Sequence, residues 1–121
     1  MSADAFAAQV RAARLRHYEP EEGVRLSYEL PSTFRIGRLL DAMRAGDGDA
    51  IIELMVPQFS AWSGVTRTML TGDGSSDAAP LGPDAARALL ADRATWVIGL
   101  AQHAVSESNE AYKRTQATAG N

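Results

Sequence analysis

The sequence contains no cysteine, and this absence removes several kinds of chemistry at once. A chain without cysteine has no disulfides, no thiolate ligands for zinc and no thiol nucleophile, which suits a reducing cytoplasm. At 121 residues the chain has the length of one domain, and a domain of this size buries enough apolar surface to fold without cross-links.

Long apolar runs and a basic excess are also missing. No run approaches the roughly 18 apolar residues that a membrane span needs, and the first residues have no signal-peptide core. Twelve Lys and Arg stand against 15 Asp and Glu, whereas proteins that bind nucleic-acid backbones tightly usually carry a basic excess. We therefore expect a protein that stays in the compartment where it is made, with no nucleic acid and no membrane as partners.

Residues with the spacing of a catalytic or metal site are scarce. His17 and His103 are the only histidines and neither belongs to a motif, and there is no Gly-x-Ser-x-Gly elbow or phosphate loop. Asp47, Asp49 and Glu53 form one acidic cluster, but it lacks the glycine and the distal glutamate of an EF-hand, and helix capping explains it. We predict no enzyme, no metal site and no cofactor.

The densest run of large apolar side chains lies between Asp49 and Val65 and predicts a central helix. Pro57 lacks an N–H group and should kink or shorten the last turn, after which Trp62 folds back against the helix. The helix and its neighbours should share one core, made by Ile52, Met55, Phe59, Leu89, Val97 and Leu100.

One segment alternates apolar and polar residues as a half-buried strand does, namely Val24 to Leu30. The sequence leaves its pairing open: it could pair with a second copy, pair with Ala78 to Leu81, or be ordinary extended chain. The preceding residues, His17 to Gly23, read as a break because Pro20 and Gly23 end helices. Other helices are predicted from Ser2 to Arg16, from about Thr33 to Gly46, from Pro83 to the corner at Asp92, and from about Trp96 to Arg114.

The predicted fold is mainly α, a small single-domain helical fold with about five helices and at most one short strand at 24–30. It consists of an N-terminal helical arm and linker at 1–23, a helical core domain at 24–115 and a flexible C-terminal tail at 116–121. On the arm, Phe6 and Val10 are the only large side chains of a thin apolar stripe. The arm is therefore either a satellite helix on the core or a docking element for a partner.

Four stretches in this order resemble the small tail assembly chaperones of long-tailed bacteriophages, which are encoded between the tail-tube subunit and the tape-measure protein. The stretches are Leu30-Pro31-Ser32, Trp62-Ser63-Gly64-Val65, Ser76-Asp77-Ala78-Ala79-Pro80 and Asp92-Arg93. The likeness spans about Val24 to Ala104. Leu81 stands where family members tend to have an aromatic residue, and the first 23 residues have no counterpart.

The resemblance implies binding without catalysis, in the cytoplasm of the infected bacterial host. Such a protein coats the tape-measure protein and keeps it soluble until tail-tube subunits polymerise around it, and a homo-oligomer is compatible with this role. Trp62, Val65 and Met69, at the loop edge of the core, are the predicted partner-binding groove, with Phe6 and Val10 on the arm as a second contact.

Two other functions remain open from sequence. In one, the chain is a structural virion protein, such as a tail completion or adaptor subunit, whose arm and strand exchange with neighbours in a ring. In the other, it is a small host regulator or an immunity-type binding module.

The chaperone family is commonly made in two lengths by a backward ribosomal slip, and G-GGA-AAC is a slip site that reads as Gly120-Asn121. The resemblance therefore also predicts a programmed frameshift.

Overall fold

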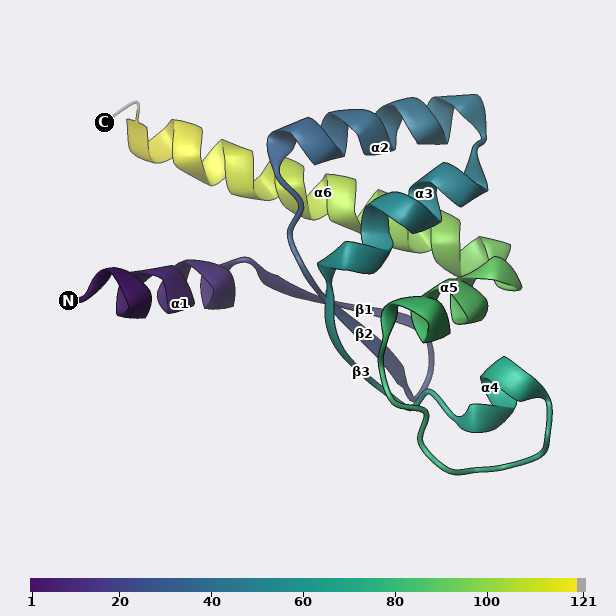
Figure 1. Ribbon diagram of the computed structural model, residues 1–121. Coiled ribbons are helices and arrows are strands. Elements are labelled where there is room, and N and C mark those ends of the chain that lie inside the picture. The colour runs from purple at the N-terminus through teal and green to yellow at the C-terminus, as the bar shows by residue number, and fades with distance from the viewer. Residues whose placement is uncertain (120–121) are drawn as a thin grey trace.

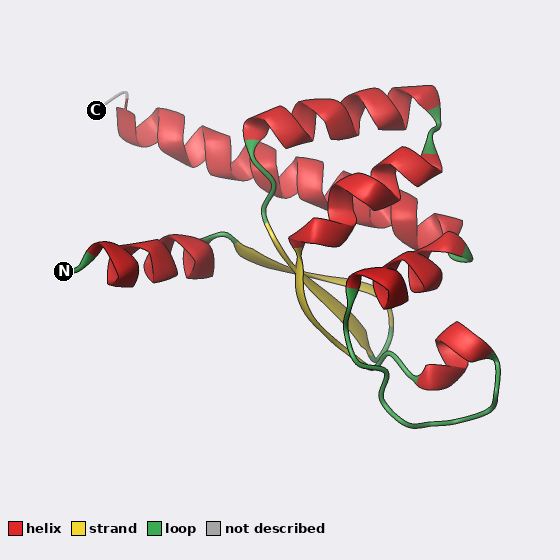
Figure 2. Ribbon diagram, in the orientation of Figure 1, coloured by secondary structure: helices red, strands yellow, loops and turns green. Residues whose placement is uncertain are grey.

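The computed structural model describes the backbone of residues 1–119 and the side chains of residues 1–117. Within this range the fold is α+β, with six α-helices and one three-stranded antiparallel sheet (Figures 1 and 2). The strands are β1 (Leu15–Glu21), β2 (Val24–Glu29) and β3 (Phe59–Ser63). The helices are α1 (Ala3–Ala13), α2 (Thr33–Ala45), α3 (Gly48–Met55) with the 3-10 turn η1 (Val56–Gln58) after it, α4 (Arg67–Thr71), α5 (Pro83–Ala91) and α6 (Ala94–Ala119).

The sheet has the order β1-β2-β3, with the central strand β2 supplying most of its buried residues. Leu26 and Tyr28 are fully buried on the face that packs against the helices. The opposite face is polar and carries His17, whose Nδ1 lies 2.7 Å from the hydroxyl oxygen of Ser27 on the neighbouring strand. A sheet with one apolar and one polar face needs a single helical cover, and α2, α3, α5 and α6 provide it (Figure 1).

The mainly α prediction, with at most one strand at 24–30, is therefore wrong. The alternating segment is indeed a strand, but it pairs within the chain, with β1 on one side and β3 on the other. β1 occupies residues that were predicted as a helix end and a break. The strand was not predicted because its half-buried positions are Arg16, Tyr18 and Pro20 instead of aliphatic residues, so the sequence shows no apolar alternation there. β3 occupies residues assigned to the central helix and its fold-back.

Proline explains where the central helix stops. The helix α3 ends at Met55, and Pro57 lies in the short turn η1. Without an N–H group at Pro57 the helical hydrogen bonds cannot continue, so Phe59 leaves the turn in extended conformation and begins β3. The predicted shortening is confirmed, but the chain then pairs with β2 instead of folding the indole of Trp62 back on its own helix.

Helix boundaries follow local signals. The side chain of Ser32 accepts a hydrogen bond from Arg35 N at the start of α2, and that of Asp47 accepts one from Ala50 N at the start of α3. Gly46, with φ of 66°, ends α2 in the left-handed conformation that suits glycine. The last helix, α6, begins at Ala94 and runs through Ala119, beyond the predicted 96–114. The expected slip-site residues, Gly120 and Asn121, lie outside the described residues.

The core lies between the sheet and its four helices. All six residues predicted to pack together belong to it, with Phe59 partly buried at its edge. Two glycines allow close approach there: a Cβ at Gly64 would overlap the carbonyl oxygen of Gly23, and one at Gly99 would overlap the hydroxyl of Tyr18. Gly99 thus lets a β1 side chain reach the backbone of α6.

Candidate partner-binding surfaces

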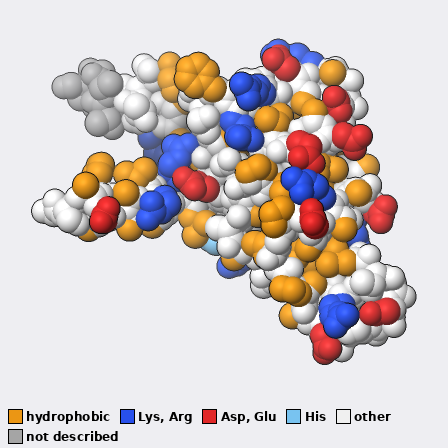
Figure 3. All heavy atoms as spheres, viewed as in Figure 1, with side chains coloured by type: hydrophobic (Ala, Val, Ile, Leu, Met, Phe, Trp, Pro, Cys, Tyr) orange, Lys and Arg blue, Asp and Glu red, His pale blue; other side chains and the backbone are white. Residues whose placement is uncertain are grey.

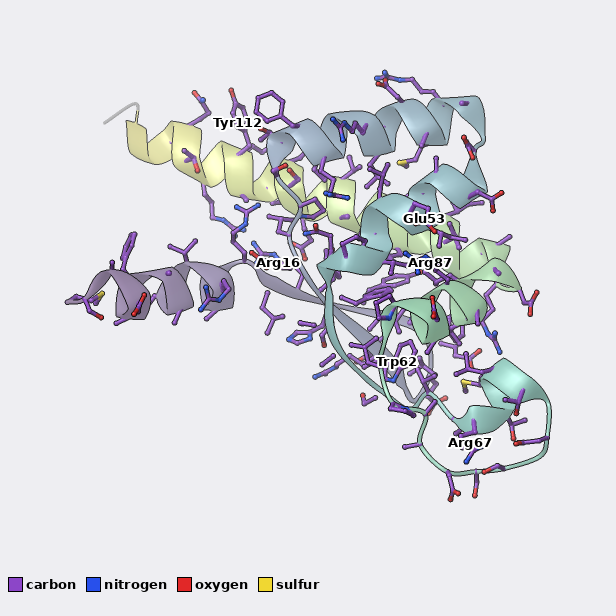
Figure 4. All side chains as sticks on the ribbon, viewed as in Figure 1. Arg16, Glu53, Trp62, Arg67, Arg87 and Tyr112 are labelled. Atoms are coloured by element: carbon purple, nitrogen blue, oxygen red, sulfur yellow. The ribbon has the colours of Figure 1, made fainter. Side chains whose placement is uncertain are left out.

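A partly buried polar cluster joins the sheet to α6. The Tyr28 hydroxyl lies 2.7 Å from Nδ1 of His103, and the ring of Tyr18 lies 5.3 Å from the His103 ring. On the other side of the imidazole, Glu107 Oε1 lies 3.6 Å from Nε2, and Glu107 also pairs with Arg16 at 3.5 Å. Residues distant in sequence therefore meet where the arm joins the body, and Figure 4 shows Arg16 at that junction.

The electrostatics of this cluster indicate a structural role. Burial lowers the pKa of His103 below its ordinary value, an effect that Glu107 opposes. Burial, reinforced by Glu107, raises the pKa of Tyr28 well above its usual range. Both groups are therefore neutral at pH 7, and the Tyr28 hydroxyl can donate to Nδ1 of His103. Tyr28 is fully buried and His103 is partly buried, so this pair packs the sheet against α6.

The described part of the chain was searched for candidate metal clusters and for helices that could span a membrane. Among those residues, no group of three or more His, Asp and Glu side chains could hold a metal ion. None of the described helices is long and apolar enough to cross a membrane.

An apolar groove of about 400 Å³ opens where the α2–α3 corner meets the α5–α6 corner. Four helices contribute to its walls, and the residues Gly46 and Gly48 leave part of the rim without side chains. Asp49, in the first turn of α3, is the one charged residue among those lining it. Its apolar lining comes from Met43, Ile51, Ile52, Leu90, Ala91, Ala94, Val97 and Ile98.

An apolar stripe on α6 starts at this groove. Ile98 lines the groove and is 52% exposed, Val105 is half-buried, and Tyr112 is 60% exposed. The three are spaced by seven residues and span about 21 Å of helix. Between Ala94 and Ser106 the helix has no Asp, Glu, Lys or Arg. Residues seven positions apart lie on one face of a helix, so these three side chains form a single apolar stripe with two exposed members.

The arm, α1, is the second exposed apolar feature. It has no buried residue; Phe6 is 60% exposed and Val10 is 41% exposed. In Figure 3 the hydrophobic side chains of the arm project from the left edge of the molecule. The arm is therefore not packed on the core as a satellite helix would be.

The predicted groove residues lie elsewhere. Trp62 is half-buried and donates from Nε1 to the carbonyl oxygen of Ala79 at 2.8 Å, which ties the loop before α5 to the sheet. Val65 is only 2% exposed, and Met69 on α4 packs against the core. These three share the loop edge of the body, whereas Phe6 and Val10 lie far away on the arm (Figures 1 and 4). Their role in partner binding stays a prediction.

The sequence reasoning missed the groove and the α6 stripe. Tyr112 is 60% exposed, and its side chain points away from the body (Figure 4). The spacing of Ile98, Val105 and Tyr112 was a usable signal. It was hidden because the inward residues of the same helix follow a similar spacing.

No protein-family model, no curated protein and no solved structure matches this chain. The functional argument therefore uses the surfaces described above and the sequence resemblance.

Proposed function

We propose that this chain is a tail assembly chaperone of a long-tailed bacteriophage. In this role it binds the tape-measure protein in the cytoplasm of the infected bacterium and keeps it soluble until tail-tube subunits assemble around it. The resemblance carried by the four sequence stretches suggests the family, and the target that it implies is a long, apolar, helix-forming chain.

The observation that carries the proposal is the apolar groove and its continuation along α6. A groove walled by helices, extended by Ile98, Val105 and Tyr112, suits one face of an amphipathic helix. Covering such a face removes the apolar surface through which free helices aggregate. Each contact is small, but many copies on one long target multiply weak contacts into stable coverage.

Co-expression tests this function. The chain should raise the soluble yield of the tape-measure protein encoded beside it, and Ile98→Asp should abolish the gain because a carboxylate would enter the apolar groove. Phe34→Asp is the matched control, since Phe34 is 87% exposed and does not line the groove. Unchanged solubility with the wild-type chain, or equal effects of the two variants, would contradict the proposal.

The projecting arm favours the alternative of a tail completion or adaptor subunit, since arms that leave a body can exchange in a ring. Purified particles separate the two functions. A chaperone is absent from finished virions, whereas an adaptor is present there in fixed stoichiometry.

A further inference from the structure

The arm presents an apolar face for which its own body offers no partner. α1 has 11 residues, none of them buried, and its large apolar side chains Phe6 and Val10 lie one turn apart. Isolated helices of this length are marginal in water, so an exposed apolar stripe on one gains stability only by docking.

The base of the arm fixes its direction. The guanidinium of Arg14 donates to the carbonyl oxygens of Leu30 at 2.7 Å and Pro31 at 2.9 Å, and Leu30 N donates to Arg14 O at 2.8 Å. Arg16 donates to Ala13 O at 2.8 Å and pairs with Glu107. These contacts hold the arm away from the body on one side, while the α2–α3 and α5–α6 corners that form the groove lie on the other (Figure 1). The arm therefore cannot reach the groove of its own chain.

The arm and the groove are complementary in shape and charge. The arm offers two large apolar side chains on a face that is otherwise alanine, and the groove is an apolar hollow of about 400 Å³. Arg11 follows Val10 directly and is basic, whereas Asp49 is the one charged residue lining the groove and is acidic. Among the described residues neither Arg11 nor Asp49 has an ion-pair partner within its own chain.

We infer that α1 of one copy docks in the groove of a second copy, with Phe6 and Val10 in the hollow and Arg11 beside Asp49. Because the arm and the groove lie at opposite ends, the contact is heterologous and copies add head to tail. One short helix in one groove forms an interface at the small end of the known range, so we expect dissociation constants of about 10 to 100 µM. The arm and a tape-measure helix would compete for this groove, but self-association is measured in the absence of that target, so its outcome is independent of the proposed function.

Sedimentation velocity between about 10 and 500 µM, a range that brackets this affinity, tests the contact. The wild-type sedimentation coefficient should rise with concentration. Phe6→Ala should shift the rise to at least tenfold higher concentration, because it removes the largest buried side chain of the interface. Phe34→Ala, the matched control on α2, should leave it unchanged. A wild-type chain that stays monomeric, or equal behaviour of the two variants, would overturn the inference.

Charge reversal identifies the groove as the docking site. Arg11→Glu and Asp49→Lys should each weaken self-association, and the two substitutions together should restore it at least in part. Both side chains are exposed, and thermal melts of each variant verify that the fold is intact. If the double variant stays as weak as the single ones, the arm docks at another surface and the inference is wrong.

Discussion

In the body of the molecule, from Val24 to Ala104, the large apolar side chains are mostly buried, whereas on the arm α1 none is. The body gains its stability by removing residues such as Leu26, Leu39 and Leu100 from water. The arm gains almost nothing in this way, because its apolar side chains stay exposed. The difference indicates that the apolar residues of the arm serve a contact outside the folded monomer, and each of the following measurements can break or sharpen this distinction.

The largest effect is expected from a core truncation on α6. Leu100→Ala should lower the free energy of unfolding by about 2 to 5 kcal/mol, since Leu100 is fully buried. Ile98→Ala, two residues away on the exposed stripe, should cost less than about 1 kcal/mol. Urea unfolding measures both. Similar losses for the two variants would mean that α6 presents a different face to the core.

A change of pH should have an intermediate effect on the free energy of unfolding, through His103 at the junction between arm and body. Burial lowers the pKa of His103, so this residue accepts a proton less readily in the folded chain than in the unfolded one. Below about pH 6.5 the unfolded chain binds more protons at this residue than the folded one, so stability is complete above that pH and falls as the pH drops through it. The free energy of unfolding should therefore decrease from pH 7 to pH 5.

His103→Gln should make this decrease shallower while keeping an acceptor for the Tyr28 hydroxyl. His17→Gln, on the outer face of the sheet, controls for the loss of a histidine as such. If the His103→Gln variant loses stability as steeply as the wild type between pH 7 and pH 5, other groups carry the pH dependence.

The smallest effect is expected from removing the arm. Deletion of residues 2–13 should change the free energy of unfolding of the dilute monomer by less than about 0.5 kcal/mol, because no residue of α1 is buried. Urea unfolding at low micromolar protein measures it. A loss above about 1 kcal/mol would show that the arm packs on the body in solution.

Features of the fold with a local cause could be predicted from the sequence. The caps at Ser32 and Asp47, the left-handed stop at Gly46 and the interruption at Pro57 each depend on a few neighbouring residues. The pairing of β2 with β1 and β3 has no such local cause. The half-buried positions of β1 are Arg16, Tyr18 and Pro20. The half-buried residues of β3, Phe59 and Trp62, are three positions apart across a register shift, so neither strand shows apolar alternation.

The candidate surfaces also differ in whether the sequence alone could predict them. Phe6 and Val10 could be found from the stripe of a single helix, and the structure leaves both exposed. The groove is formed by four helices that meet only in the folded chain, so no window of the sequence contains it. Val65 was predicted to belong to a groove at the loop edge of the core. Its side chain is only 2% exposed, and its carbonyl oxygen accepts a hydrogen bond from Ala79 N of the returning loop.

The insertion of α2 and α3 between β2 and β3 has a consequence for the time course of folding. β1 and β2 form a local hairpin, whereas the contact of Ser60 with the carbonyl oxygen of Ser27 joins residues 33 positions apart. Closing that longer loop costs more chain entropy before any contact compensates for it. During synthesis the hairpin can form early, but one edge of β2 stays unpaired until β3 has left the ribosome. Docking of β3 is therefore the step that we expect to limit the folding rate, and until then the open edge of β2 is the site most exposed to aggregation.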